Sequence, residues 1–352
     1  MQVLVTGGAG FIGSHACQRL LRDGHGVVCL DNLCRGRMGA VEALRAGDGG
    51  DRLAFVEGDV GDRDLVSGVL ERHGVDAVLH FAALAYVGES VDHPLRYYRA
   101  NVAGTIGLLE ACAQARGGAG VERFVFSSSC ATYGDPPEGM IPVPETCPQH
   151  PTSPYGRTKL VCEHVLREYA GARAIAGKRF GVAMLRYFNV AGSDRTGAIG
   201  EDHDPETHLI PVAIQAALGV RPGMHIFGTD YPTPDGTCVR DYVHVEDLID
   251  AHVRVLERLG GRKDPVEVVA YNVGIGRGYS VREVLDAVRR VSGVDFEVSE
   301  GPRRAGDAVA LYNDPSKLGR EVGWRAGVDD LDEIVASAWR WMRAHPRGYA
   351  GS

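Results

Sequence analysis

The stretch "TGGAGFIG" (residues 6–13) decides the fold, because it joins a strand-like apolar run to the start of a helix-like one. Gly8, Gly10 and Gly13 match G-x-G-x-x-G, and Gly7, Gly10 and Gly13 match the looser G-x-x-G-x-x-G. Glycines in such a turn let the backbone approach a pyrophosphate closely, and the following helix N-terminus supplies N–H groups and a positive dipole end. The position between strand and helix therefore predicts a dinucleotide-binding turn.

Two acidic residues follow the next two strand-like runs. Asp31 ends "GVVCLD" (26–31). A carboxylate at that point can accept hydrogen bonds from an adenosine ribose diol and would repel a 2′-phosphate, so the sequence favours NAD over NADP. Asp59 ends "LAFVEGD" (53–59). It can accept from the adenine amine or cap the next helix, and the sequence leaves both interpretations open.

Apolar runs alternate with helix-like stretches through the first half of the chain. Short buried runs of this kind, separated by helical patterns, are typical of a doubly wound parallel sheet of the Rossmann type. The predicted strands are 3–7, 26–31, 53–59, 77–82, 123–129 and 182–189, and the predicted helices are 11–23, 62–73, 93–116 and 154–170.

The pattern changes after Asn189, where a polar stretch begins. We expect helices near 209–219 and 246–259, a strand, a helix and a strand across 267–300, and a last helix near 331–344. The fold class is therefore α/β, with a Rossmann-type NAD-binding domain at 1–188, to which the chain returns around 239–262, and a smaller C-terminal α/β substrate-binding domain at 189–352.

Charge and cysteine content exclude several classes of partner. The chain has 352 residues, with 38 Lys and Arg against 46 Asp and Glu, for a net charge of −8. This charge argues against nucleic acid and against anionic membranes. The eight cysteines form no C-x-x-C pair, which favours a reducing cytoplasm over a disulfide framework. No apolar run is long enough to span a membrane, and the first residues do not have the pattern of a signal peptide.

The stretch "SPYGRTK" (153–159) carries the predicted chemistry. Ser153 is a good N-cap and Pro154 suits the first helical position, so Tyr155 is expected in the first turn of a helix. Lys159 then lies one turn away on the same face, where its charge favours the phenolate form of Tyr155. The run "FSSS" (126–129) ends a strand and places Ser129 at the same sheet edge.

Together these motifs resemble the extended short-chain dehydrogenase/reductase family. Within it, the chain resembles the UDP-glucose 4-epimerases, also called UDP-galactose 4-epimerases, over nearly its whole length. The stretches that carry this resemblance are "DNLCRG" (31–36), "FVEGD" (55–59), "VGESV" (87–91), "YYRANVAGT" (97–105), "SPYGRTK" (153–159), "LRYFNVAG" (185–192), "DGTCVRDYVHV" (235–245), "PRRAGD" (302–307) and "WRWMRAHPRGYA" (339–350).

The resemblance implies an isomerase of galactose metabolism that oxidises C4 of a UDP-sugar transiently. NAD would take the hydride, Tyr155 the hydroxyl proton, and the 4-keto sugar would turn before the hydride returns to its other face. Ser129 would bind the 4-oxygen, and Lys159 would reach the nicotinamide ribose. The implied cofactor contacts are Gly7, Gly10, Phe11, Ile12, Gly13, Asp31, Asn32, Asp59, Val60, Phe81, Ala82, Asn101, Tyr155, Lys159 and Phe188. The implied UDP-sugar contacts are Ser129, Tyr155, Asn189, His208, Leu209, His225, Phe227, Arg240, Arg304, Asp307 and Leu311.

Several positions depart from the family's commoner pattern and leave the sugar open. His208 stands where many members have Asn, and Ala85 where some have Lys. Leu311 stands where hexose-specific members often have Tyr, so a 2-acetamido sugar such as UDP-GlcNAc is an alternative substrate. UDP-arabinose and UDP-xylose are another, because "YFNVAGSD" also resembles the pentose branch. A catalytically silent nucleotide sensor is an alternative of a different class.

Three further expectations follow. Cys130 and Ala131 occupy the places where dehydratases carry an acid pair, so we discount 4,6-dehydration. The stretch "GEDHDPETH" (200–208) is expected to be a solvated loop and not a metal site, because its spacing lacks a helix-based ligand pair. The resemblance also implies a homodimer formed through two helices of the first domain.

Overall fold

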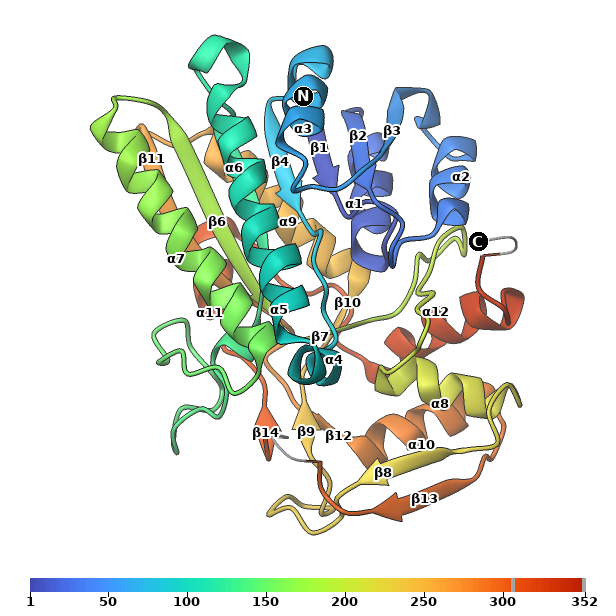
Figure 1. Ribbon diagram of the computed structural model, residues 1–352. Helices are drawn as coiled ribbons and strands as arrows, with labels where there is room; N and C mark the ends of the chain where they lie inside the picture. The colour runs from blue at the N-terminus through green and yellow to red at the C-terminus, as the bar shows by residue number, and fades with distance from the viewer. Residues whose placement is uncertain (305–307, 350–352) are drawn as a thin grey trace. The chain divides into compact units, whose positions relative to one another are not determined.

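The computed structural model describes residues 1–304 and 308–349, and the chain divides into two compact units. Both units are assembled from segments that are far apart in the sequence (Figure 1). The first unit contains Met1–Asp135, Pro148–Arg186 and Ile249–Tyr271, and the second contains Pro136–Cys147, Tyr187–Leu248 and Asn272–Ser352.

A seven-stranded sheet forms the centre of the first unit, in the order β11-β6-β5-β4-β1-β2-β3. The pairs β1–β2, β2–β3, β1–β4 and β4–β5 are parallel, which confirms the predicted doubly wound fold. The strands are β1 (Gln2–Thr6), β2 (Gly26–Asp31), β3 (Leu53–Glu57), β4 (Ala77–His80), β5 (Arg123–Ser129), β6 (Phe180–Tyr187) and β11 (Val266–Val273).

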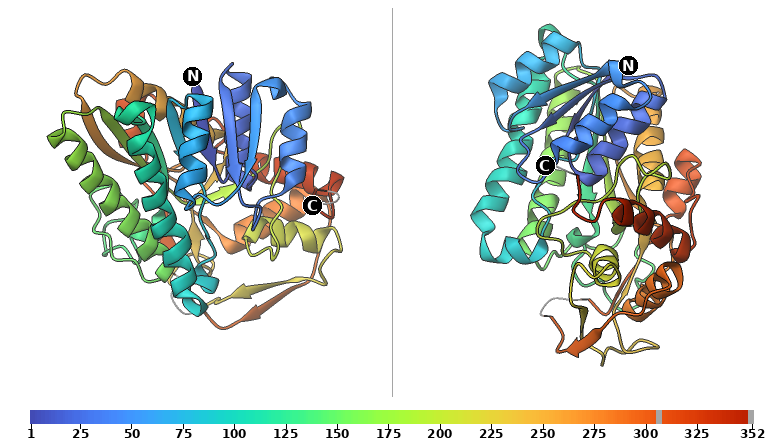
Figure 2. Two further views of the ribbon diagram at one scale, coloured as in Figure 1. Left: turned by 45° about the horizontal axis from the view of Figure 1, so that its top comes forward. Right: turned by 90° about the vertical axis from the view of Figure 1, so that its right-hand side faces the viewer.

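Helices cover both faces of this sheet. Figures 1 and 2 show α3, α6 and α7 on one side and α1, α2 and α9 on the other. Apolar side chains of α3, α6 and α7 form one buried core with the strands they cover. The helices of this unit are α1 (Phe11–Arg22), α2 (Met38–Ala46), α3 (Arg63–His73), α4 (Val87–Asp92), α5 (Pro94–Tyr97), α6 (Gly104–Gln114), α7 (Pro154–Ile175) and most of α9 (Val245–Gly260), with short 3₁₀ turns η1 (Gly50–Arg52), η3 (Arg116–Gly118) and η4 (Cys130–Thr132).

The single helix predicted near 93–116 is interrupted. Between α5 and α6 the backbone forms a π-helical segment, η2 (Tyr98–Ala103). Asn101 lies within it, and its side-chain amide binds both the N–H and the carbonyl of Leu84. π-Helical turns are uncommon and are found mostly near functional sites. The interruption therefore serves to hold Asn101 against a second segment of the chain.

Among its described residues, the second unit contains small sheets, four helices and the start of α9. Strands β7 and β10 pair in parallel, as do β8 and β13, while β9 lies between β12 and β14. Helix α10 packs against α8 and α12 and starts with a capping box between Ser280 and Glu283. The elements are β7 (Asn189–Ala191), α8 (Leu209–Ala217), β8 (Met224–Phe227), β9 (Val239–Arg240), β10 (Tyr242–His244), β12 (Tyr279–Ser280), α10 (Val281–Ser292), β13 (Val298–Gly301), β14 (Ala310–Leu311), α11 (Ser316–Val322) and α12 (Leu331–Ala344).

Two expectations from composition can be compared with this structure. All eight cysteines lie among the described residues and form no disulfide, as expected. Among the helices of residues 1–304 and 308–349, none combines the length and the apolar character needed to cross a bilayer.

Candidate active site

The glycine-rich turn joins β1 to α1 in a conformation that needs glycine. Gly7 has φ +70°, a left-handed value, and a Cβ there would lie 2.7 Å from the amide nitrogen of Ala82. A Cβ on Gly13 would lie only 2.1 Å from the carbonyl oxygen of Gly7. Gly10 is the N-cap of α1, no side chain caps the helix, and its first turn holds no acidic residue. The helix N-terminus is therefore left to bind an anion.

Asp31 connects this turn to the end of β2. Its side chain is 8% exposed and accepts hydrogen bonds from the backbone N–H groups of Ala9 (3.0 Å) and Leu33 (2.8 Å). Burial raises the pKa of Asp31, although the two backbone hydrogen bonds oppose the shift. Since a carboxylate has about four acceptor positions, these bonds leave capacity for a ligand hydroxyl.

The structure brings Asn32 and Asp59 together beside Asp31. The Asn32 amide donates to the Asp59 carboxylate at 2.8 Å, and the same carboxylate accepts from the Gly61 N–H at 2.8 Å. The N-cap of α3 is Asp62, whose side chain accepts from Leu65 N. Asp59 is therefore not the cap of the following helix, which removes one of its two sequence interpretations.

Other expected cofactor residues lie at the same sheet edge or near it. Phe81 and Ala82 follow β4, and both backbone N–H groups bind Thr6 at the end of β1. Asn101 is 2% exposed and, besides Leu84, donates to the hydroxyl of Thr158 at 3.0 Å. Its amide thus holds the loop after β4 against α7. Four further residues were expected to contact the cofactor. Phe11 and Ile12 begin α1, Val60 precedes α3, and Phe188 belongs to the second unit.

Tyr155 and Lys159 lie in the first turns of α7, as predicted. Ser153 caps the helix by accepting from Gly156 N, and Pro154 occupies the first helical position. Tyr155 is 9% exposed, and its backbone N–H donates to Ser90 Oγ at 3.1 Å. The conformation of the helix start is therefore fixed from both sides.

Lys159 is fully enclosed and reaches the end of β5. Its Nζ donates to the carbonyl oxygen of Ser127 at 2.7 Å and lies 5.9 Å from the centre of the Tyr155 ring. Burial lowers the pKa of Lys159 to about 8, so its ammonium group stays charged at neutral pH. A cation at this distance in a dry environment favours a negative charge on the phenol.

Ser129 completes this group at the last position of β5. Its hydroxyl accepts a hydrogen bond from Ala131 N at 3.1 Å, which leaves the hydroxyl proton to donate. Ala131 in turn packs against the cluster formed by Leu84, Tyr97 and Tyr155. The three expected catalytic residues therefore converge where β5 ends and α7 begins.

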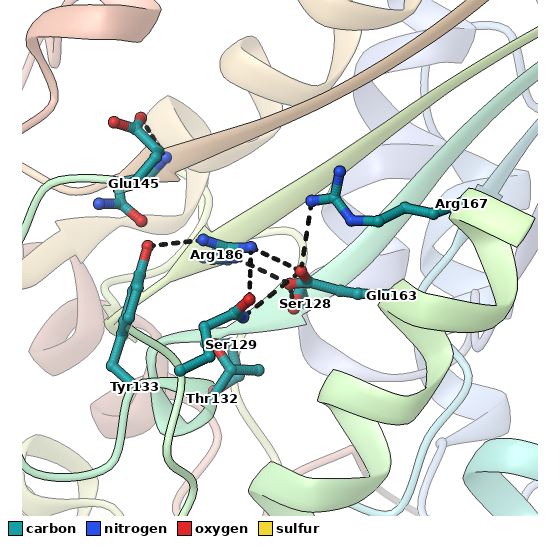
Figure 3. Close-up of polar contacts among 10 residues, drawn as sticks. Ser128, Ser129, Thr132, Tyr133, Glu145, Glu163, Arg167 and Arg186 are labelled. Carbon is teal, nitrogen blue, oxygen red and sulfur yellow. Dashed lines mark hydrogen bonds and ion pairs between the residues drawn. The ribbon is translucent and has the colours of Figure 1, made fainter. Parts of the chain in front are cut away.

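A buried ion pair that the sequence did not indicate fixes this region (Figure 3). Glu163 and Arg186 have side chains 1% and 3% exposed, and they form two hydrogen bonds of 2.6 and 2.8 Å. Glu163 also accepts from Ser128 Oγ at 2.6 Å, and Arg186 donates to the Tyr133 hydroxyl at 3.0 Å. The pair thus ties α7 to β5, β6 and the loop after β5. One signal was available, since Glu163 follows Lys159 by one helical turn and shares its inward face.

In the second unit, four expected UDP-sugar contacts line one cavity of about 600 Å³. Leu209 begins α8, His225 and Phe227 alternate outward on β8, and the Arg304 guanidinium lies 4.2 Å over the Phe227 ring. Arg221 adds a second cation to the same wall. The lining also includes Glu206 and Glu297. The part of the wall that suits an anionic ligand with a planar group is therefore the one formed by the two guanidinium groups and the Phe227 ring.

The other expected substrate residues lie elsewhere in this unit. Arg240 on β9 and Leu311 on β14 are register partners, and Arg240 donates to the carbonyl oxygen of Ala308 at 2.8 Å. Among the described residues, neither belongs to the lining of the cavity. Asn189 begins β7, where its N–H binds Asp241 O. Asp307 lies outside the described residues.

The expectation of a solvated loop before α8 is wrong for two of its acidic residues, whereas Asp204 is exposed as expected. Glu201 and Glu206 are each 7% exposed and face the imidazoles of His203 and His208. Burial alone would lower the pKa of each histidine. Interactions with the two carboxylates outweigh it and raise the pKa of His203 to about 9 and that of His208 to about 10.

Comparison with known proteins identifies the family. The model of the NAD dependent epimerase/dehydratase family matches residues 3–274, which include the glycine-rich turn, Ser129, Tyr155 and Lys159. The chain belongs to this family. The description of the family names NAD as its cofactor.

Relatives of this family match the chain over nearly its full length. A probable UDP-arabinose 4-epimerase 3 from Oryza sativa subsp. japonica is 45% identical over 99% of this chain and 84% of its own. UDP-glucose 4-epimerase from Lacticaseibacillus casei is 44% identical over 99% of both chains. These matches confirm the resemblance to UDP-glucose 4-epimerases.

A solved structure of the family has the same architecture. UDP-glucose 4-epimerase from Stenotrophomonas maltophila, crystallised with NAD and formylated UDP-arabinopyranose, superposes with a TM-score of 0.90 at 42% identity, covering 99% of both chains. The buried pair Glu163–Arg186 is a feature of this chain that sequence patterns did not indicate.

Proposed function

We propose that this chain is an NAD-dependent UDP-sugar 4-epimerase acting on UDP-glucose and UDP-galactose. The observation that carries the proposal is the charged, buried Lys159 beside Tyr155, fixed to the end of β5 next to Ser129. A phenol made basic in this way can remove and return a proton at neutral pH. Its full-length relatives named as UDP-glucose and UDP-arabinose 4-epimerases support the same reaction class.

The first unit fits NAD. Gly7 and Gly13 have no room for a Cβ, α1 offers an uncapped N-terminus for the pyrophosphate, and Asp31 offers carboxylate acceptors for a ribose diol. We propose that these residues, with Asn32 and Asp59, hold the adenosine diphosphate half of the cofactor. When bound, NAD supplies reversible hydride acceptance from C4 of the sugar.

The remaining steps belong to side chains of the protein. Tyr155 would take the proton from the 4-hydroxyl through its phenolate oxygen and give it back to the same oxygen after the sugar has turned. Lys159 would keep the phenolate stable without itself losing its proton at neutral pH, because the pKa of Lys159 is about 8. Ser129 would donate a hydrogen bond to the 4-oxygen in both orientations of the sugar.

The second unit would hold the nucleotide while the sugar turns. We propose that the nucleotide binds in the cavity of about 600 Å³, where Arg304 would bind the diphosphate and Phe227 the planar base. Leu209 and His225 would contribute to the walls of this cavity. Arg240 and Leu311 would contribute from the adjoining strands β9 and β14. A nucleotide bound by guanidinium groups can remain fixed while its sugar rotates about the diphosphate bonds.

A pentose pair, UDP-arabinose and UDP-xylose, is the second candidate. Named UDP-arabinose 4-epimerases are as similar to this chain as the glucose enzymes are, and a related structure was solved with a UDP-arabinopyranose derivative. Leu311 is smaller than Tyr, so it also leaves the 2-acetamido pair, UDP-GlcNAc and UDP-GalNAc, as a candidate.

The experiment that tests these proposals measures interconversion directly. The purified protein is incubated with UDP-galactose, UDP-arabinose and UDP-GlcNAc in separate reactions, and the products are separated by chromatography. Formation of UDP-glucose from UDP-galactose supports the leading proposal. If the pentose or acetamido pair is interconverted faster than the hexose pair, that pair is the preferred substrate instead. If all three pairs stay unchanged although the protein binds NAD, a silent sensor is the correct reading.

We also propose that the protein is a homodimer in the cytoplasm. The helical segment α4 to α6 exposes a row of apolar side chains, including Val91 (62% exposed) and Leu95 (78% exposed), with Val87 and Tyr98 beside them. Val87 and Val91 lie one turn apart on α4, and Leu95 lies on α5, which begins after a break at His93. Exposed apolar side chains concentrated in this way are typical of a protein interface. Leu95→Glu should convert a dimer to a monomer in light scattering, whereas Ile175→Glu, at the exposed end of α7, should not.

A further inference from the structure

Four side chains with metal-ligating atoms converge in the segment that leads into α8. They are Glu201, His203, Glu206 and His208, and one ligand atom from each lies within 4.8 Å of all the others. The His203 Nδ1 atom lies 3.1 Å from Glu201 Oε1 and 3.6 Å from Glu206 Oε2. The His208 Nδ1 atom lies 3.0 Å from Glu201 Oε1 and 2.9 Å from Glu206 Oε1.

These distances match the edges of a tetrahedral coordination shell. With metal–nitrogen and metal–oxygen bonds of about 2.0–2.1 Å, two ligands of a tetrahedral Zn²⁺ ion are separated by about 3.3 Å. The four nitrogen–oxygen separations, from 2.9 to 3.6 Å, lie around this value. All four ligand atoms lie within 4.8 Å of one another, so small side-chain rotations would bring them around one ion.

Two protonated imidazole rings would lie close together in this cluster. Both Nδ1 atoms lie near Glu201 Oε1, Glu206 faces both rings, and the ring centres are 5.0 Å apart. Two positive charges at this separation repel each other, whereas a single ion bound by two neutral imidazoles would remove that repulsion.

We propose that Glu201, His203, Glu206 and His208 bind one divalent transition-metal ion, with Zn²⁺ as the best-fitting example. Two imidazole nitrogens and two carboxylate oxygens form a donor set that Zn²⁺ accepts in tetrahedral geometry. Both carboxylates are buried, His203 has 19% of its side chain exposed and His208 has 42%. The ion would thus be held inside the unit, with access from the side of His208.

The surroundings of Glu206 are those of a positioned ligand. Its Oε1 accepts from the backbone N–H groups of Thr207 and His208, both at 2.7 Å, and its carbonyl oxygen accepts from Arg221 at 3.1 Å. Hydrogen bonds of this kind fix the orientation of a metal-binding carboxylate. Glu206 and Leu209 also line the cavity of about 600 Å³, so the ion would stabilise one wall of that cavity.

The test uses the full-length protein and the metal alone. After removal of metal by a chelator and dialysis, Zn²⁺ is titrated in competition with a chromophoric chelator, and the bound ion is counted by elemental analysis. We expect one tight equivalent for each chain. His203→Ala and Glu206→Gln should weaken binding by at least about 10- to 100-fold. His164→Ala is the matched control, because His164 is exposed on α7 and lies outside the cluster.

Substitution by Co²⁺ gives a readout that does not depend on a variant folding. The proposed site should give the visible bands of tetrahedral Co²⁺ without a thiolate charge-transfer band, because none of its ligands is a cysteine. Zn²⁺ should also raise the thermal transition of the wild type and leave that of His203→Ala unchanged. The proposal is overturned if no equivalent binds, if His203→Ala binds as tightly as the wild type, or if the Co²⁺ spectrum shows thiolate ligation.

Discussion

Replacing Glu163 by Gln tests whether the buried ion pair holds the catalytic helix in place. The substitution removes one negative charge and changes the shape of the side chain very little. In the wild type, Arg186 contacts both carboxylate oxygens of Glu163, at 2.6 and 2.8 Å, and the two side chains are 3% and 1% exposed. In Glu163→Gln the guanidinium keeps Tyr133 and Gln149 but loses the carboxylate that balances its charge.

The expected loss can be estimated from the burial of the pair. Removing one partner of a buried ion pair costs about 3–5 kcal/mol, because the other charge stays in a dry environment. Glu300→Gln provides the matched control, since Glu300 pairs with Arg282 at 2.6 Å on the surface, with side chains 51% and 41% exposed. An exposed pair of this kind contributes about 0–1 kcal/mol. The same chemical change should therefore cost at least about 2 kcal/mol more at residue 163.

The assay is urea unfolding of the wild type and both variants, followed by circular dichroism at neutral and acidic pH. Burial alone would raise the pKa of Glu163, but the hydrogen bonds and charge of Arg186 outweigh it and hold the pKa below its ordinary value of 4.5. A carboxylate with a lowered pKa stabilises the fold above pH 4.5 and loses that effect as the pH falls through the folded-state value. The advantage of the wild type over Glu163→Gln should therefore shrink in acid. A loss at neutral pH no larger than that of Glu300→Gln would refute the reasoning.

Three further predictions concern the same unit. Tyr155→Phe should lower epimerase turnover by about 10²- to 10⁴-fold while UDP-sugar affinity, measured by calorimetry, is largely kept; near-normal turnover would remove Tyr155 as the base. Burial lowers the pKa of Lys159 from 10.5 to about 8, so between these pH values the unfolded chain binds one more proton than the folded protein. The free energy of unfolding of the wild type should therefore rise from pH 8 to 10.5, and Lys159→Met should abolish this rise. Stability of the wild type that does not change with pH across this range would contradict the prediction. Gly13→Ala should abolish NAD binding and destabilise the protein, because the new Cβ would lie 2.1 Å from Gly7 O. Gly68→Ala, where the Cβ would meet open space on α3, should be neutral or stabilising by up to about 1 kcal/mol in thermal unfolding. Equal behaviour of the two variants would be evidence against the tight turn.

Local sequence patterns predicted most elements of the first unit because each depends on neighbouring residues. A buried strand, the glycine turn and the capped start of α7 at Ser153 all follow from residues within one or two turns of each other. The interruption at η2 could not be predicted in this way. It depends on Asn101 binding Leu84 and Thr158, which are distant in sequence.

The expected active-site residues divide in the same manner. Tyr155 and Lys159 were found from a four-residue spacing that one helix turn explains. Glu163 and Arg186 were missed, because a buried charge is recognisable only when its partner on another element is known. The burial of Glu201 and Glu206 before α8 was missed for a related reason, since a rule based on helical ligand spacing says nothing about how a loop folds.

By itself, the sequence determined the α/β class, the phosphate-binding turn at residues 6–13 and the pairing of Tyr155 with Lys159, since each is a property of one strand, turn or helix. The tertiary structure alone decided that Pro136–Cys147 joins the second unit and that β11 pairs beside β6. The return of the chain to the first unit was expected around 239–262, and the structure places it at Ile249–Tyr271. The tertiary structure also decided which buried charges are balanced. The physical reason is that strand pairing and charge burial are set by contacts between distant segments, whose free energy is not encoded in the periodicity of either segment.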